Sequence, residues 1–249
     1  MIPADKRRLF DAWFAGHAGR RIGRSFARAR VRGLETAAAA RETAPLLLVS
    51  NHVSWWDPLV ALWLSRRVLH LDGHALMDAE NLRRLPFFRK VGAFGVDLAD
   101  PRDGAKALRY GARLLDRPGR MVWVFPEGRE RPAGGRPLPF LPGAAAMARL
   151  AREAVVLPVG LAYVFAGTER PDLYVSIGAA LPAVGDPAAG ARVQAEAVEA
   201  ELDRITAAVE GRDAGFETLL ARGRRLGRAA EGTLARLTAP HGAHLRDRG

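Results

Sequence analysis

Residues 45–57 read PLLLVSNHVSWWD and join an apolar segment to a group of polar side chains. The first part, Pro45 to Ser50, is short and almost wholly apolar, which is typical of a β-strand buried on both faces of a sheet. Asp57 and the following Pro58 suit the N-cap and the first turn of a helix. Strand, polar loop and helix in this order predict an α/β unit with His52 just beyond the strand. Ligands of such sheets bind beyond the carboxyl ends of the strands, so this loop is a candidate site.

Apolar segments alternate with helical ones on both sides of this stretch. Further strands are expected within 69–78, 93–98, 121–125, 155–165 and 173–177. Helices are expected over 58–67, 79–90, 101–115 and 144–153, and a late helix carries Val198, Leu202, Ile205 and Val209. This alternation predicts a mixed, mostly buried β-sheet covered by helices on both faces, in one α/β domain over residues 34–211.

The positive charge is concentrated at the two ends of the chain. The 249 residues carry a formal net charge of +11. Residues 1–33 carry a net charge of +7 and residues 212–249 a net charge of +4, whereas residues 34–211 are neutral. We therefore expect a polyanionic partner at the ends, either nucleic acid or anionic lipid.

Apolar residues between the basic ones favour lipid. In residues 212–249 they recur at helical spacing with arginines opposite, the pattern of a basic amphipathic C-terminal helix at a lipid interface. Residues 1–33 are predicted to form basic amphipathic N-terminal helices, and Gly16 and Gly19 favour a kink or two short helices. The alternative is that both apolar stripes pack on the protein's own core.

The sequence contains no apolar segment long enough to span a bilayer, and no apolar signal core follows the basic N-terminus. We expect a cytoplasmic protein that lies peripherally on the inner face of an anionic membrane. A nucleic-acid-binding protein is the alternative that the charge leaves open, but zinc-finger spacing and an RNA-recognition aromatic signature are missing. No nucleic-acid partner is therefore expected.

A histidine and a carboxylate lie five residues apart in the loop after the first strand. Near neutral pH, His52 is the side chain best suited to accept a proton. Asp57 can fold back across the turn to the far ring nitrogen, where it fixes the tautomer and stabilises the imidazolium. His52 and Asp57 are therefore candidate catalytic residues.

A second motif, Phe125-Pro126-Glu127-Gly128, follows another apolar strand. Glu127 could border the same crevice, together with arginines of the following loop. An ordinary surface turn is the alternative. The chain has no cysteine, and none of its serines lies in G-x-S-x-G, which argues against a thiol or serine hydrolase.

Together the motifs resemble the lysophospholipid acyltransferase family, which includes the 1-acylglycerol-3-phosphate acyltransferases. That family carries N-H-x-x-x-x-D after a strand, then G-x-x-x-x-x-R, then F-P-E-G-T-R-S, and then a late apolar strand containing Pro. The counterparts, in the same order, are Asn51 to Asp57, Gly92 to Leu98, Phe125 to Arg131, and Val155 to Gly160. The resemblance spans about residues 44–182 and implies an α/β sheet with N-terminal helices on the membrane.

The resemblance also implies the activity. A fatty acyl group would move from acyl-CoA or an acyl carrier protein to a hydroxyl of a lipid acceptor, such as a lysophospholipid. His52 would act as general base on that hydroxyl, with Asp57 orienting it. Glu127 and Gly128 would belong to acceptor binding and site architecture, and Arg129 and Arg131 of the same loop are further candidates for substrate binding. No catalytic metal is implied, and no cofactor besides the acyl donor, which is a co-substrate.

Two departures from the family pattern concern the acceptor. Leu98 stands where the family has an arginine that binds the acceptor phosphate, and Arg129-Glu130-Arg131 replaces T-R-S. Leucine cannot supply the planar cationic fork that a phosphate prefers. Arg102, Arg129 or Arg131 could take over this contact. Alternatively the acceptor carries no phosphomonoester, as in a glycolipid, an amino-acid lipid or a hydroxylated or glycosylated terpenoid.

Three tryptophans near the first strand are candidates for an acyl groove: Trp55, Trp56 and Trp63. Large aromatic side chains beside a buried strand also serve as core, which is the alternative for all three. An inactive lipid-binding relative of the acyltransferases is the last alternative, because of the two departures.

Overall fold

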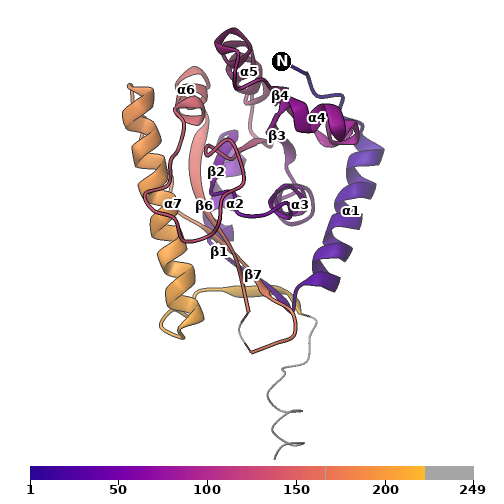
Figure 1. The fold of residues 1–249 in the computed structure, drawn as a ribbon, viewed down its shortest axis with the longest axis vertical. Helices are drawn as coiled ribbons and strands as arrows, with labels where there is room; N and C mark the ends of the chain where they lie inside the picture. Colours follow the sequence, from indigo (N-terminus) through magenta and orange to yellow (C-terminus); the bar gives the residue numbers. More distant parts are fainter. Residues whose placement is uncertain (166, 222–249) are drawn as a thin grey trace, which may run out of the picture.

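An eight-stranded mixed β-sheet forms the centre of the protein, in the strand order β4-β3-β5-β2-β6-β7-β1-β8 (Figure 1). The structure is a computed structural model that describes residues 1–165 and 167–221. The strands are β1 (Arg28–Arg32), β2 (Leu46–Ser50), β3 (Asp72–Asp78), β4 (Ala93–Val96), β5 (Arg120–Val124), β6 (Val155–Val164), β7 (Asp172–Ile177) and β8 (Glu217–Ala221). The α-helices are α1 (Arg8–Ser25), α2 (Leu34–Thr43), α3 (Asp57–Trp63), α4 (Ala79–Arg84), α5 (Pro101–Leu114), α6 (Gly143–Leu150) and α7 (Pro187–Val209). A π-helix over Leu64–Val68 continues α3, and a 3-10 helix over Pro86–Val91 follows α4.

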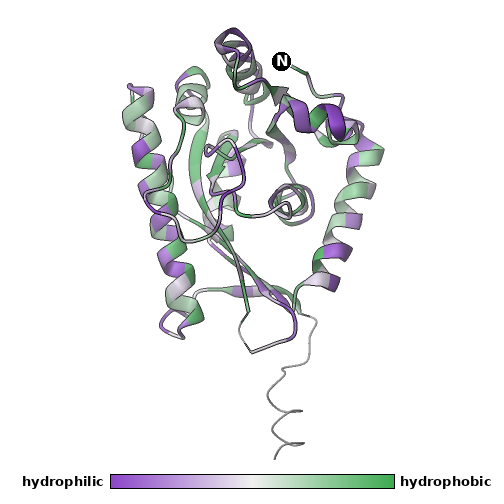
Figure 2. Ribbon diagram, in the orientation of Figure 1, coloured by the Kyte–Doolittle hydropathy of each residue, from purple (hydrophilic) through white to green (hydrophobic). Residues whose placement is uncertain are grey.

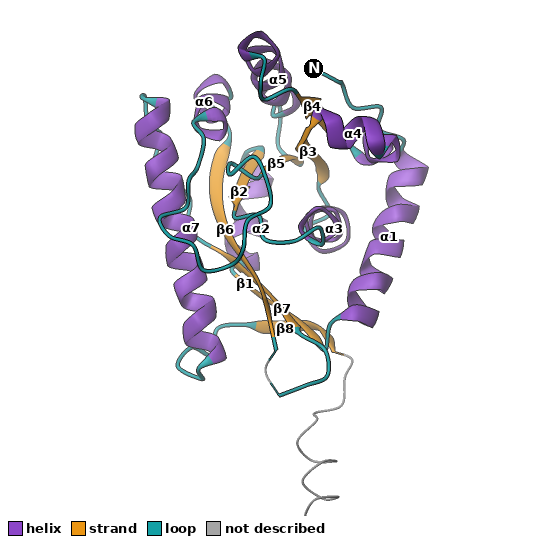
Figure 3. Ribbon diagram, in the orientation of Figure 1, coloured by secondary structure: helices purple, strands orange, loops and turns teal. Residues whose placement is uncertain are grey.

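Helices cover both faces of the sheet, as the sequence pattern predicts (Figure 3). β4, β3, β5, β2 and β6 are mutually parallel, while β6 and β7 pair antiparallel. Alternate residues of β2 divide between two cores: Leu46 and Leu48 pack toward α1 and α3, whereas Leu47 and Val49 pack toward α6 and α7. Both faces of β2 are buried, which agrees with the apolar run Leu46 to Val49 (Figure 2).

The prediction of a kink or of two short helices near the N-terminus is wrong, since α1 is one continuous helix over Arg8–Ser25. Close packing explains the glycines within it. A Cβ atom at Gly19 would lie 3.0 Å from Cδ1 of Trp63, so glycine lets α1 approach α3. Leu9 and Trp13 point away from this contact and are 89% and 57% exposed.

Residues 28–32, assigned above to the N-terminal helices, instead form β1. Its sequence RARVR alternates, and Ala29 and Val31 are buried while the arginines are partly exposed. β1 runs parallel to β7 and lies between β7 and β8. The sharp turn from β1 into α2 requires glycine, because Gly33 has a φ of 77° and a Cβ there would lie 2.0 Å from the carbonyl oxygen of Ile177.

The start of the expected C-terminal helix is also a strand. Residues 217–221 form β8 and pair antiparallel with β1, and Phe216 packs edge-on against Tyr174 with ring centroids 5.5 Å apart. The helix prediction is therefore wrong up to residue 221, since sheet pairing with β1 outweighs the helical spacing of these apolar residues. The remainder of that predicted helix, residues 222–249, lies outside the described residues.

The sheet consequently extends beyond the range 34–211 on both sides, through β1 and β8. Within residues 1–165 and 167–221, no helix combines the length and the apolar character needed to cross a membrane.

Candidate active site

The carboxyl end of β2 is fixed to β6 by one side chain. The Asn51 amide donates to the carbonyl of Leu161 at 2.9 Å, and the Leu161 N–H donates to Oδ1 of Asn51 at 2.8 Å. Both residues are buried, so Asn51 continues the ladder between the two strands where β2 itself has ended. The start of the loop of residues 52–57 is therefore fixed relative to β6.

The loop from His52 to Asp57 folds around one carboxylate. Oδ2 of Asp57 accepts from the backbone N–H of Val53 at 2.8 Å and of Ser54 at 2.9 Å, and it lies 2.7 Å from Nδ1 of His52. Asp57 is fully buried, whereas the His52 side chain is 16% exposed. The histidine and the carboxylate that the sequence singled out are thus in direct contact.

This contact determines what His52 can do. A carboxylate only accepts, so the neutral imidazole carries its hydrogen on Nδ1 and leaves the lone pair of Nε2 to take a proton. The ring stacks on Phe125 with centroids 4.5 Å apart, which fixes its plane. The arrangement is that of a general base held by a carboxylate.

Glu127 joins the loop after β5 to the loop after β2. Its Oε1 accepts from the backbone N–H of His52 at 2.7 Å, its Oε2 lies 3.6 Å from Nε of Arg131, and the N–H of Arg131 donates to the His52 carbonyl at 2.8 Å. Burial raises the pKa of the Glu127 carboxyl, while the His52 N–H and the Arg131 charge oppose that rise. Glu127 therefore helps to fix the position of the His52 backbone through this hydrogen bond.

A cavity of about 770 Å³ opens beside these residues. Asn51, Val53, Glu127 and the loop of residues 131–139 line it, whereas His52 and Asp57 are not among its lining residues. This loop crosses in front of β2 and reaches α7 (Figure 1). The remaining walls are largely apolar residues of β6 and α7, namely Leu161, Ala162, Val164, Leu202, Ile205 and Val209. Such a volume and lining suit a ligand with a long apolar part.

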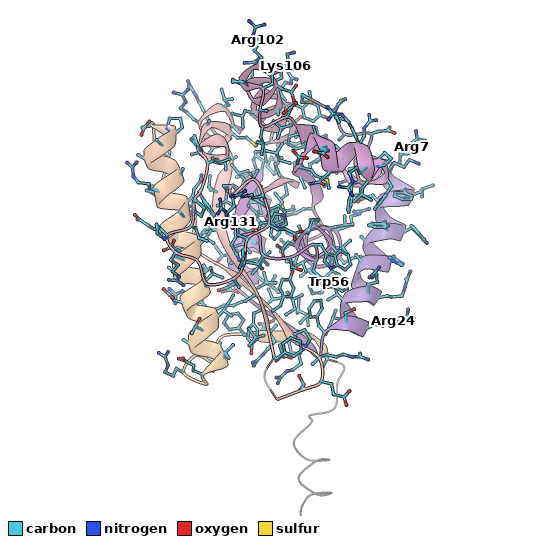
Figure 4. All side chains as sticks on the ribbon, viewed as in Figure 1. Arg7, Arg24, Trp56, Arg102, Lys106 and Arg131 are labelled. Carbon is cyan, nitrogen blue, oxygen red and sulfur yellow. The ribbon has the colours of Figure 1, made fainter. Side chains whose placement is uncertain are left out.

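The other residues singled out in the sequence lie at various distances from this cavity. Arg131 lines the cavity and lies near the centre of the view in Figure 4. Arg102 lies in the first turn of α5, at the top of the same view. Gly128 has a φ of 72°, and its site is flanked by Leu98 and Leu141. Arg129 is exposed.

The three tryptophans do not border this cavity. Trp63 is 5% exposed and belongs to the core between α1 and α3. Trp55 is 52% exposed and packs against Trp56, with ring centroids 4.6 Å apart, and the Arg21 guanidinium lies over both rings.

Sequence reasoning missed one residue of the site. The hydroxyl of Tyr163 donates to Oδ1 of Asp57 at 2.5 Å. The two residues are 106 positions apart, and a tyrosine in an apolar strand carries no signal of such a contact.

Comparisons with known proteins agree with this architecture. A family model described as Acyltransferase matches residues 28–162. Among solved structures, the chain is similar to the crystal structure of the 1-acyl-sn-glycerophosphate (LPA) acyltransferase PlsC from Thermotoga maritima, with a TM-score of 0.55 and 17% sequence identity over 77% of this chain and 78% of that one. No curated protein matches the sequence. At this identity the structural likeness concerns the fold.

Proposed function

Because the chain belongs to the acyltransferase family, we propose that it transfers a fatty acyl group from acyl-CoA or an acyl carrier protein to a hydroxyl of a lipid acceptor, in the manner of a lysophospholipid acyltransferase. The observation that carries this proposal is the 2.7 Å contact between His52 and Asp57 beside a cavity bordered by Glu127. Comparing the lipids of cells with and without the gene by mass spectrometry tests it, since product and acceptor differ by the mass of one acyl group.

In the proposed reaction, Nε2 of His52 removes the proton of the acceptor hydroxyl as its oxygen attacks the thioester carbonyl. Asp57 stabilises the imidazolium that forms. The tetrahedral intermediate then collapses, the carbon–sulfur bond breaks, and the leaving thiol takes the proton from His52. Acyl ester and free thiol are the products, without an acyl-enzyme.

We place the alkyl chain of the substrate in the cavity between the loop 131–139, β6 and α7. Leu202 lies near Gly160, whose neighbour Leu161 pairs with Asn51, while Val209 lies about 10 Å farther along α7 at the helical rise of 1.5 Å per residue. The α7 residues that line the cavity therefore extend along the helix away from Asn51.

Filling this cavity from its far end is expected to change the preferred chain length. Val209→Trp should lower kcat/KM for palmitoyl-CoA relative to octanoyl-CoA by about 10-fold, because the longer chain meets the indole. Leu202→Trp, nearer His52, should lower the activity toward both donors. Ala200→Trp, an exposed site on the same helix, is the matched control. An unchanged donor preference in Val209→Trp would place the acyl chain elsewhere.

The acceptor has a second candidate, a lipid without a phosphomonoester. Leu98 and Leu141, which are 54% and 46% exposed, flank Gly128 and present an apolar surface beside the Glu127 loop. Arg131 is engaged by Glu127, which leaves it less available to a phosphate. Assays with lysophosphatidic acid and with a glycolipid of equal chain length separate the two acceptor classes.

We further propose that α1 docks the enzyme on anionic membrane. Leu9 and Trp13 are exposed on one face of this helix, and the basic residues Arg20, Arg21 and Arg24 follow toward its end. Apolar side chains entering the interface and arginines near the head groups stabilise this position together.

The double variant Leu9→Ser with Trp13→Ser is expected to lower the partition coefficient onto phosphatidylglycerol vesicles by about 10-fold or more, because two large apolar side chains are lost from the interface. Sedimentation of vesicles with bound protein measures it. Leu150→Ser removes an exposed leucine from α6 and should have no effect. Deletion of residues 1–33 is unsuitable, since it removes β1 from the sheet. Equal binding by the double variant and wild type would show that α1 does not dock.

A further inference from the structure

The Asp57 carboxylate has two oxygens in different surroundings. Oδ2 receives three donors from its own loop, His52 among them. Oδ1 faces β6 and receives the hydroxyl of Tyr163 at 2.5 Å. Because Asp57 is fully buried, an oxygen without a donor would be costly there, so this hydroxyl determines how the carboxylate is held.

Tyr163 is itself held firmly. Its ring stacks on Phe26 with centroids 5.4 Å apart, and Phe26 in turn packs edge-on against Trp56 at 5.1 Å. Two residues earlier in β6, Leu161 is locked to Asn51 by two hydrogen bonds. The strand that carries Tyr163 is therefore in a fixed register with the loop that carries His52.

The tyrosine approaches Asp57 from the face of the sheet that packs against α1 and α3. Side chains alternate along β6: Ala162 and Val164 pack with α7, while Tyr163 packs with the core of α1 and α3. Tyr163 is not among the residues that form the cavity wall. It can act on the reaction through Asp57 without touching a substrate.

We propose that Tyr163 is a positioning residue for the His52–Asp57 pair, a role that rests on the proposed acyl transfer. Its hydroxyl orients the carboxylate so that Oδ2 faces Nδ1 of His52, and it shares the negative charge of that carboxylate. Burial and the adjacent Asp57 raise the pKa of Tyr163, so its hydroxyl stays protonated and always donates. The imidazolium formed in the reaction then faces a carboxylate oxygen whose direction is fixed.

Tyr163→Phe keeps the ring and removes only the donor. The variant should lower kcat about 10-fold, as expected for losing a hydrogen bond to a charged group, with the KM of donor and acceptor within about 2-fold of wild type. The pH–rate profile should also differ from that of wild type, because the carboxylate that faces the imidazolium has lost one donor. Glu127, Arg131 and Glu130, the other charged groups near the pair, are unchanged in this variant.

Tyr174→Phe is the matched control. Tyr174 is a buried tyrosine on the adjacent strand β7, and its hydroxyl accepts from Arg30. Its variant should keep the wild-type kcat and pH profile even where thermal stability falls. In the background of Asp57→Asn, Tyr163→Phe should have little further effect on kcat, since both changes interrupt one interaction.

A measurement without substrate separates this inference from the proposed function. The His52 Nδ1 proton bonded to a carboxylate gives a downfield NMR signal, whose shift and pH dependence should change in Tyr163→Phe and stay as in wild type in Tyr174→Phe. Loss of acyl transfer in the His52→Ala variant supports the proposed function but does not bear on the role of Tyr163. A Tyr163→Phe enzyme with the same NMR signal, kcat and pH profile as Tyr174→Phe overturns the positioning role, whether or not acyl transfer is found.

Discussion

Replacing His52 with alanine is expected to lower the kcat of acyl transfer by about 10²- to 10⁴-fold, the contribution of a general base to such reactions. The acceptor hydroxyl then loses the group proposed to take its proton. Binding of the acyl donor should persist, because the cavity wall of β6 and α7 is unchanged. Steady-state assays with palmitoyl-CoA measure the first effect, and calorimetry with a non-hydrolysable thioether analogue measures the second.

His70→Asn provides the control for this variant. His70 is an exposed histidine with a φ of 53°, a conformation that asparagine tolerates, so the substitution removes an imidazole without straining the backbone. Its kcat should equal that of wild type. Near-normal turnover by His52→Ala would remove His52 from the mechanism and, with it, the reason for assigning Asp57 a role.

Replacing Asn51 with leucine is expected to lower the free energy of unfolding by about 2–6 kcal/mol, because both buried backbone groups of Leu161 lose their partner at once. Urea denaturation followed by circular dichroism measures this change. Acyl transfer should fall as well, since Leu161 and Asn51 keep Tyr163 in register with Asp57.

Asn81→Leu is the comparison for Asn51→Leu. The Asn81 side chain is exposed at the start of α4, so the same chemical change there should alter the unfolding free energy by less than about 0.5 kcal/mol. Equal urea midpoints for the two variants would show that the amide of Asn51 contributes nothing to the junction of β2 and β6.

The central strands could be predicted because they are buried on both faces. β2 and β5 each contain a run of four apolar residues, 46–49 and 121–124, a pattern that depends on no distant contact. β1 and β8 could not be predicted in this way. RARVR has a single β-branched residue among arginines, and β8 pairs only because β1 is placed beside it, nearly 190 residues earlier in the chain.

In the candidate site, too, the local contacts could be predicted from the sequence and the contacts between distant segments could not. His52 and Asp57 lie in one loop, so their contact depends on a single turn and can be anticipated from spacing. The cavity depends on how α7 lies over β6, and Tyr163 depends on the register of β6 against β2. Such contacts arise from packing between distant segments, which a local pattern of residues does not encode.

The position of β1 also sets the order of assembly. Its neighbours in the sheet are β7 and β8, so residues 28–32 leave the ribosome long before residues 172–177 and 217–221 exist to receive them. Closing so long a loop slows folding, so β1 has no partner strand until β7 and β8 have been made. A chain truncated before residue 217 would keep β1 as an open edge, the kind of edge through which unfinished β-proteins aggregate.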